Sequence, residues 1–381
     1  MFLMHKDIPV ADVTVIDGTI IDVNKILNVE HYPVGAMSKY PQLAGKFLDN
    51  WQKTRAIPHD RQNATRIIEK TGCSLDEAAF KNMAVSLTDC YWFKNDGRLS
   101  WSDVNYHENG FSEDYAYDMI FGINGNIDFR TPDFTTDGVL KKYWLSLDGI
   151  PTLVKFGDLG EEANGKNLLS ANEVVAARIA KIMEIPHVDY FPIQLGKSGK
   201  IVSGCPCFIS DSNLEFVNGL QLEKEGRLKS GADLWGHMCS MGMRDFLEHM
   251  IVFDYIIGNT DRHTKNFGVI RDPDTLEIKF AAPLFDSGSS FGWNGEYNIS
   301  KIVTKPFRDN ANDQLALVSK FPNNIPDFKE ISRIIEDVYL GFSISEQQCE
   351  KAKRMVQHNM ETMFLKKEKE LIFITGDDIE L

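Results

Sequence analysis

One polar loop and the short element that follows it limit most strongly how this chain can fold. The loop reads Gly258-Asn259-Thr260-Asp261-Arg262-His263-Thr264-Lys265-Asn266-Phe267-Gly268, and Pro283-Leu284-Phe285-Asp286-Ser287-Gly288 comes after it. It presents a carboxylate at Asp261, an amide five residues later at Asn266, and a second carboxylate twenty residues after that at Asp286. A hairpin between the loop and the second carboxylate would bring all three groups to one cleft.

Phosphoryl transfer from a nucleotide uses such a set, because the protein contributes mainly by positioning the reactants and neutralising charge on the phosphates. Protein kinases place an Asp, an Asn and a second Asp in this order. By that ordering Asp261 orients the attacking hydroxyl and accepts its proton, whereas Asn266 and Asp286 bind Mg²⁺, which prefers oxygen ligands. His263 either braces the loop or contacts a phosphate, or it is a buried histidine with one hydrogen bond. Asp, Asn and Gly are each common in turns, so turn formation explains the individual residues of the loop. It does not explain why they occur in this order and are followed by a second Asp.

Two charged residues upstream are candidates for nucleotide binding. Lys155 is the one charge in the apolar run 151–156, where burial is costly unless the ammonium meets an anion such as the phosphates of ATP. Alternatively, it lies at a strand edge and extends to water. Glu173 is the natural partner for Lys155, but with Ser170 it also fits a helix capping box. Phe208 is expected at the linker that binds adenine, and only its position in the order of predicted elements supports this.

The segment 131–138 precedes the lysine strand, where a loop that covers the phosphates belongs. It contains neither G-x-G-x-x-G nor a Walker motif, so a plain β-turn explains it equally well. Thr135 and Thr136 within it are candidate autophosphorylation sites.

Hydrophobic periodicity predicts the order of elements. We expect a hairpin over 8–35 with Asp17-Gly18 as its turn and helices over 59–83 broken near Gly72. Strand-like structure is expected over 131–156, around turns at Asp137-Gly138 and Asp148-Gly149. A helix starting near Ser170, strands on both sides of 196–199, and a helical segment from about 230 that stops at 258–259 follow. Further expected elements are a hairpin around 272–274 and helices over 326–340 and 344–369.

Bulk composition excludes several classes of protein. The chain has 381 residues with 41 basic and 55 acidic side chains, a net charge of −14, which argues against broad binding to nucleic acid. Six cysteines are too few for a disulfide framework in a chain this long, and we expect reduced thiols. The polar start is unlike a signal peptide, and no apolar run approaches the roughly 20 residues of a membrane span. We therefore expect a cytoplasmic protein; export by a dedicated secretion system would leave no mark in the sequence.

Residues 130–290 resemble the HipA-like kinase family, whose catalytic loop has the form Asp-x-His-x-x-Asn followed by an aromatic-Asp pair. Here those positions are Asp261, His263, Asn266 and 285–286. Lys155, the pair 172–173 and, more loosely, the run 136–144 also look like family positions. The Asp-Arg-His-x-x-Asn string is similar to that of phosphatidylinositol kinases, which share the wider kinase-like fold.

The resemblance implies a serine/threonine protein kinase that uses ATP and Mg²⁺, in a family that includes toxins of toxin–antitoxin pairs and bacterial effectors. Two departures limit what carries over. The serine-containing phosphate loop of the toxins is not evident, and the first 125 residues do not match the N-terminal subdomain of the toxin. The sequence therefore leaves open whether the chain binds an antitoxin or another regulatory partner.

We accordingly predict an α+β, two-lobed kinase-like fold: an N-terminal extension over 1–125, a β-rich lobe over 126–225 and a mainly helical lobe over 226–381. The predicted reaction is transfer of the γ-phosphate of ATP to a Ser or Thr hydroxyl of a protein substrate, with autophosphorylation as a variant. A phosphoinositide lipid kinase, with basic residues Lys301, Lys305 and Arg308 for headgroups, is one alternative. An inactive kinase fold that serves as a binding module is another, and a metal-dependent hydrolase is a third.

Overall fold

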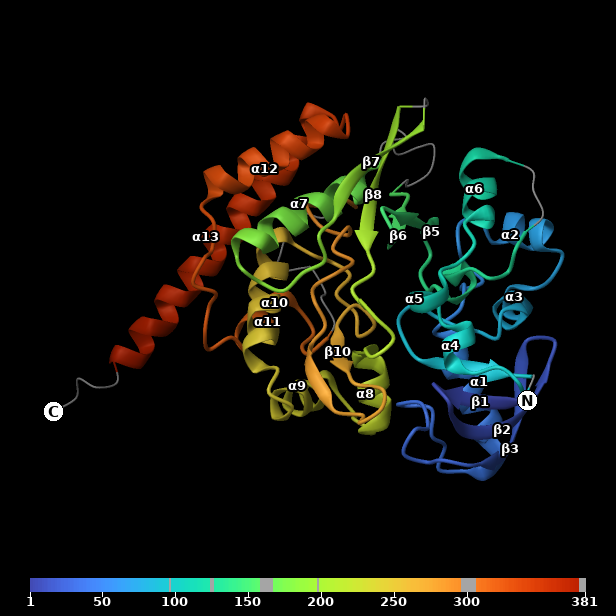
Figure 1. Cartoon of the computed structure of the whole chain (residues 1–381). Coiled ribbons are helices and arrows are strands. Elements are labelled where there is room, and N and C mark those ends of the chain that lie inside the picture. Colours follow the sequence, from blue (N-terminus) through green and yellow to red (C-terminus); the bar gives the residue numbers. More distant parts are fainter. Residues whose placement is uncertain (96, 124–126, 158–166, 197–198, 296–305, 377–381) are drawn as a thin grey trace. The chain divides into compact units, whose positions relative to one another are not determined.

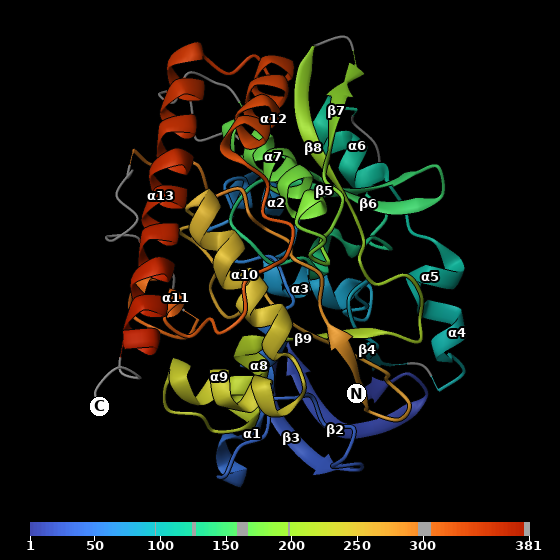
Figure 2. The ribbon, with the colours of Figure 1, turned by 90° about the vertical axis from the view of Figure 1, so that its left-hand side faces the viewer.

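The computed structural model describes residues 1–95, 97–123, 127–157, 167–196, 199–295 and 306–376 (Figure 1). The chain forms two compact units, each built from separate stretches of sequence. Unit 1 contains residues 1–156, 204–229 and 268–282; unit 2 contains 157–203, 230–267 and 283–381. The predicted boundaries at 125 and 225 stay predictions. Figure 2 shows the same ribbon from a second side.

Unit 1 combines antiparallel strands with short helices. Its strands are β1 (Phe2–His5), β2 (Ile8–Ile16), β3 (Thr19–Ile26), β4 (Tyr91–Lys94), β5 (Lys142–Leu147), β6 (Ile150–Lys155), β9 (Glu215–Asn218), β10 (Gly268–Arg271) and β11 (Ile278–Ala281). Its helices are α1 (Ala44–Lys53), α2 (Ala64–Thr71), α3 (Leu75–Lys81), α4 (Trp101–Val104), α5 (Tyr106–Asn109), α6 (Asp114–Phe121) and α8 (Gly219–Glu225), with 3₁₀ turns η1 (Pro41–Leu43) and η2 (Pro132–Thr135).

The predicted hairpins of unit 1 are confirmed, because turn residues determine them locally. β2 and β3 are joined at Asp17-Gly18, whose φ values of +48° and +76° suit a tight hairpin turn, and they belong to a sheet of order β3-β2-β1-β4. β10 and β11 form the hairpin predicted around 272–274, in a second sheet of order β11-β10-β9. Helices α2 and α3 are separated at Gly72, which has φ +66°.

The segment before the lysine strand differs from the prediction. β5 and β6 form a hairpin with its turn at Asp148-Gly149, as expected, but residues 132–135 form the 3₁₀ turn η2 and not a strand. Hydrogen bonds at the start of this turn explain the difference. The Thr131 hydroxyl accepts from the Asp133 N–H (3.4 Å) and donates to the buried Asp133 carboxylate (2.6 Å), which also accepts from the Trp144 N–H (3.0 Å). A side chain that bonds its neighbouring backbone competes with the strand ladder.

Unit 2 is mainly helical. It contains α7 (Leu168–Ile182), β7 (Phe191–Leu195), α9 (Gly231–Ser240), α10 (Arg244–Ile257), α11 (Ala311–Leu315), α12 (Phe328–Gly341) and α13 (Glu346–Gly376). β8 (Lys200–Pro206) follows β7 and runs across the boundary from unit 2 into unit 1. α12 packs against both α7 and α13, and α13 packs against α10 (Figure 2). The predicted helices over 326–340 and 344–369 and the strands beside 196–199 are confirmed.

Two details of unit 2 correct the prediction. α7 begins at Leu168 with Asn167 as its N-cap, so the capping box proposed for Ser170 and Glu173 is wrong and both residues lie inside the helix. The helical segment after residue 230 is two helices, because the chain makes a turn at 241–242, where Gly242 has φ +82°.

All six cysteines are free thiols, as expected. Among the described residues, none of the helices combines the length and the apolar character that a membrane crossing requires.

Candidate functional site

α10 delivers the polar loop, and a glycine ends that helix. Gly258 caps α10 with φ +61°, a left-handed conformation that suits glycine. A β carbon there would lie 1.7 Å from Cε of Met355 on α13, so the position is also closely packed. Asn359, also on α13, donates to the Ile256 carbonyl at 3.2 Å and satisfies part of the last turn. The start of the loop is therefore held by packing from a helix about a hundred residues away in sequence.

The loop is ordered by its own side chains. The Asn259 oxygen accepts from the Asp261 N–H at 3.0 Å, and the Asn266 side-chain nitrogen donates to the Asp261 carbonyl at 3.0 Å. Because the nitrogen of Asn266 makes this bond, its oxygen is the atom suited to a hard cation. The Asp261 side chain is 56% exposed, so its carboxylate is accessible to a substrate. His263 is not buried: 46% of its side chain is exposed, and its Nε2 lies 4.0 Å from Asp261 Oδ1.

Asp286 lies in a segment (284–291, the Asp286 segment) with a strained backbone. Asp286 has φ +56°, an uncommon conformation for a residue with a β carbon, and its N–H donates to the Tyr190 hydroxyl at 3.1 Å. The Thr260 N–H and hydroxyl both donate to the Ser289 carbonyl at 2.9 Å, so the loop and the Asp286 segment are directly joined. Strained residues held by several partners are common at functional sites.

Arg262 connects the loop, the Asp286 segment and α10. Its side chain is fully buried and donates to both carboxylate oxygens of Asp254, at 2.9 and 3.0 Å. The same guanidinium donates to the Asn266 carbonyl (3.0 Å), the Phe285 carbonyl (2.6 Å) and the Ser287 hydroxyl (2.9 Å). Burial lowers the pKa of Arg262, but the surrounding carboxylates, chiefly Asp254, outweigh this and the net pKa is raised.

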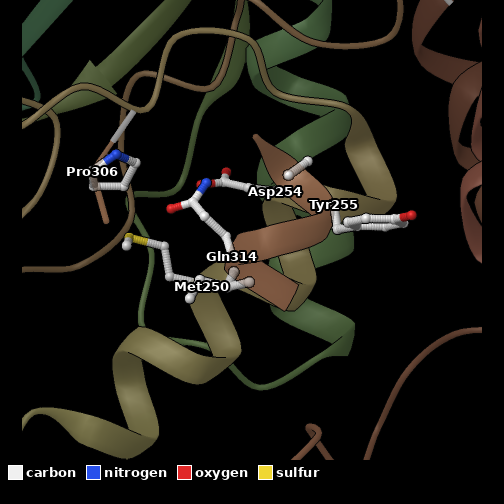
Figure 3. Close-up of a pocket in the computed structure, with 7 residues that line it drawn as sticks. Met250, Asp254, Tyr255, Pro306 and Gln314 are labelled. Atoms are coloured by element: carbon white, nitrogen blue, oxygen red, sulfur yellow. The ribbon is translucent and has the colours of Figure 1, made fainter. Parts of the chain in front are cut away.

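A small pocket lies beside Asp254, on the helix behind the loop. It is lined by Met250, Ile251, Asp254, Tyr255, Pro306, Ala311 and Gln314. Figure 3 shows the polar ends of Asp254 and Gln314 within it. Its volume of about 10 Å³ has room for a single water molecule rather than a substrate.

α7 contributes two buried polar residues that hold the Asp286 segment. Glu173 accepts from the Ser287 N–H at 3.0 Å. Asn172 donates to the carbonyls of Gly288 and Ser290 at 2.9 Å and accepts from the Tyr339 hydroxyl at 2.6 Å. Both residues are nearly inaccessible to solvent. Glu173 thus lies next to the predicted metal ligand, while its predicted pair with Lys155 stays a prediction, because Lys155 belongs to unit 1.

Lys155 is buried at the end of β6, with 6% of the residue exposed. In the β5–β6 register it lies directly opposite Lys142, whose Nζ donates to the Asp137 carbonyl at 3.0 Å. Two like charges opposite each other destabilise a sheet unless an anion balances them. The burial disfavours the alternative in which Lys155 extends to water.

The remaining predicted positions in unit 1 have structural contacts of their own. Phe208 is partly buried and packs edge-to-face on Phe216, with ring centroids 5.3 Å apart. The hydroxyl of Thr135 donates to the Val85 carbonyl at 2.7 Å, and that of Thr136 donates to the Pro132 carbonyl at 2.8 Å. Phosphorylation of either threonine would require these bonds to break.

A metal ion at the candidate site would be bound by few protein side chains. No group of three or more His, Cys, Asp or Glu side chains suited to a metal ion occurs in the part of the chain that the structure describes. Mg²⁺ commonly takes one or two protein oxygens and completes its shell with water and substrate phosphates. The oxygens of Asn266 and Asp286 fit that donor set, since the loop and the Asp286 segment are joined through Arg262.

Sequence reasoning did not identify Arg262, Asp254 or Tyr190 as parts of this site. A signal existed for Asp254, which is the lone charge in the apolar stretch 250–257 and therefore needed a buried partner. No comparable signal marks Tyr190.

Comparison with solved structures identifies the fold of this chain. No family model matches the sequence, and no curated protein matches it either. Among solved structures, HipA in the toxin–antitoxin complex of Shewanella oneidensis MR-1 with HipB and operator DNA aligns over 95% of this chain and 96% of its own, with 13% identity and a TM-score of 0.50. The proinflammatory kinase CtkA of Helicobacter pylori aligns over 58% of this chain and 90% of its own, with 20% identity and a TM-score of 0.44. The alignment with HipA spans nearly the whole of both chains, so it also includes most of the first 125 residues, for which the sequence alone indicated no match. This chain therefore has the α+β fold of HipA, in agreement with the predicted fold class.

Proposed function

We propose that this chain is an ATP- and Mg²⁺-dependent serine/threonine protein kinase. The observation that carries the proposal is the joined arrangement in unit 2, where an exposed Asp261, the oxygen of Asn266 and the strained Asp286 belong to two segments tied together by hydrogen bonds. Phosphoryl transfer asks the protein for little beyond such an arrangement of oxygens and charges. The kinase-like fold supports the same reaction class.

In the proposed reaction Asp261 accepts the proton of a Ser or Thr hydroxyl of a protein substrate. The hydroxyl oxygen forms a bond to the γ-phosphorus of ATP, the bond from that phosphorus to the bridging oxygen breaks, and ADP leaves with the electron pair. Asn266 and Asp286 would hold Mg²⁺, which, when bound, neutralises charge on the phosphates. Lys155, which lies opposite Lys142 in the β5–β6 register, is proposed to supply positive charge for the phosphates. Phe208 is proposed to contact adenine, and His263, half exposed beside Asp261, to contact the substrate or a phosphate.

The experiment is transfer of labelled γ-phosphate from Mg·ATP by purified wild type and by Asp261→Ala, with protein and phosphoinositide offered separately. Removing a positioned base typically lowers the rate by about 10²- to 10⁴-fold. Asp286→Ala should in addition weaken Mg²⁺-dependent nucleotide binding. Asp245→Ala is a matched control, because Asp245 is an exposed aspartate of the same unit, 72% exposed on α10.

The outcomes separate the alternatives. Label on protein, lost in Asp261→Ala and kept in the control, supports the proposal. Label on lipid alone would favour the phosphoinositide kinase; of its predicted basic residues, Lys301 and Lys305 lie outside the described residues. Nucleotide binding without transfer to either acceptor would favour an inactive binding module. Full activity in both Asp261→Ala and Asp286→Ala would refute the site.

A regulatory partner is part of the proposal. HipA of S. oneidensis was solved with HipB and operator DNA. We infer that a protein partner of antitoxin type is the candidate regulator of this chain, whereas the net charge of −14 disfavours direct contact with DNA. Co-purification of the chain with the product of a neighbouring open reading frame, followed by assay of transfer with and without that product, tests this.

A further inference from the structure

The guanidinium of Arg262 donates hydrogen bonds to four residues at the candidate site. Within one guanidinium, Nη1 donates to the carbonyls of Asn266 and Phe285, and Nη2 donates to the Ser287 hydroxyl and to Asp254. The two residues of the Asp286 segment that it contacts are the chain neighbours on either side of Asp286. Arg262 also donates to the backbone carbonyl of Asn266, the other candidate metal ligand.

We propose that Arg262 is a positioning residue: its guanidinium sets the separation of the Asn266 and Asp286 oxygens, and through it the affinity of the site for a divalent cation. This inference rests on the proposed function, because it takes Asn266 and Asp286 as the metal ligands. Arg262 itself is buried, with 1% of the residue exposed, so its proposed effect is exerted through the residues that it contacts.

The chemistry of the side chain explains why arginine is required. Guanidinium is planar and holds five donors in fixed directions, so a single group can bridge two carbonyls, a hydroxyl and a carboxylate. A lysine ammonium at the same place carries the same charge but has three donors that rotate about a flexible stem. It would keep the charge balance with Asp254 and lose the fixed spacing.

The strain at Asp286 makes the spacing sensitive to this support. With φ +56°, the Asp286 backbone stays in a sparsely populated conformation only while its surroundings hold it there. Arg262 supplies contacts on both sides of it, at Phe285 and Ser287. Without them the segment can relax, and the carboxylate then leaves the position that matches Asn266.

The test is the Mg²⁺ dependence of wild type, Arg262→Lys and Ser287→Ala. The control is Arg178→Lys, which changes an exposed arginine of the same unit that pairs with the exposed Asp337. Two quantities are measured for each: the Mg²⁺ concentration for half-maximal γ-phosphate transfer at saturating ATP, and the Mg²⁺ dependence of ADP binding by calorimetry.

Loss of support for metal ligands commonly weakens metal affinity by about 10- to 100-fold, so Arg262→Lys should raise the half-saturating Mg²⁺ at least about tenfold. Excess Mg²⁺ should then restore much of the rate. Ser287→Ala should shift the same quantity in the same direction by a smaller factor, and Arg178→Lys should leave it unchanged. If Arg262→Lys does not fold, the half-saturating Mg²⁺ of Ser287→Ala tests the inference instead.

A residue with only a structural role would lower the active fraction, and hence the maximal rate, without moving the half-saturating Mg²⁺; that result overturns the inference. If wild type binds Mg·ADP but transfers no phosphate, the proposed function fails, and the binding curves still decide the role of Arg262. If wild type binds no Mg·ADP, both are refuted.

Discussion

Replacing Asn172 by alanine should destabilise unit 2 strongly, although the residue is not predicted to take part in chemistry. Asn172 is fully buried on α7, where its side chain bonds the carbonyls of Gly288 and Ser290 and the hydroxyl of Tyr339. Alanine leaves all three partners buried without it. The side chain of Tyr339 comes from α12, so the change also breaks a link between α7 and α12.

The expected cost follows from these three hydrogen bonds. Each buried group left unsatisfied costs about 1–3 kcal/mol, so for the three partners together the cost is about 3–9 kcal/mol. Hydrogen–deuterium exchange of peptides from α7 and α12 measures the opening free energy of this unit directly. Protection there should fall by that amount, while peptides from the sheet of β1 to β4 in unit 1 should keep theirs.

A double-mutant cycle with Tyr339→Phe tests the reasoning. Tyr339→Phe alone should cost about 1–3 kcal/mol, because it leaves the Asn172 oxygen unsatisfied, and the two changes should be coupled by about 1 kcal/mol. Tyr255→Phe is the matched control: its hydroxyl donates to Asn312 (2.9 Å), which is partly exposed and can bond water instead. A loss below about 1 kcal/mol for Asn172→Ala, or strict additivity with Tyr339→Phe, would refute the account.

Two further predictions concern a buried acid and a helix end. Burial raises the pKa of Asp133 to about 7, so the folded protein binds an extra proton above the pKa of the unfolded chain, about 3.9, and stability falls as pH rises through about 7. Asp133→Asn should remove that dependence, so that its melting temperature relative to wild type rises between about pH 5 and about pH 8; an unchanged dependence would contradict the burial argument. Gly258→Ala should cost unit 2 about 1–2 kcal/mol from left-handed backbone strain, measured by urea unfolding. Because the Met355 methyl that it meets is the end of a flexible side chain, Gly258→Ala should cost the same amount in a Met355→Ala background as in wild type. A cost that disappears in that background would show that it was steric.

The turns and the order of the candidate groups were predictable from the sequence. Asp17-Gly18 and Asp148-Gly149 reverse the chain where predicted, because their backbone preferences act within two residues. The end of α10 at Gly258 follows from the same local rule. The order of Asp261, Asn266 and Asp286 is likewise a property of the chain itself, and it predicts the kinase-like fold without reference to tertiary structure.

Tertiary structure decided which partner each buried polar group takes. Glu173 resembled a capping residue beside Ser170, yet it lies inside α7 and accepts from Ser287, 114 residues away. Arg262 is an ordinary loop residue in sequence; its role depends on Asp254, Phe285 and Ser287 meeting one buried guanidinium. Local backbone preferences act over a few residues and are determined by neighbouring side chains. The partners of a buried charge depend instead on how distant elements pack, since removal from water makes such a group bond whatever polar atoms the fold brings within reach.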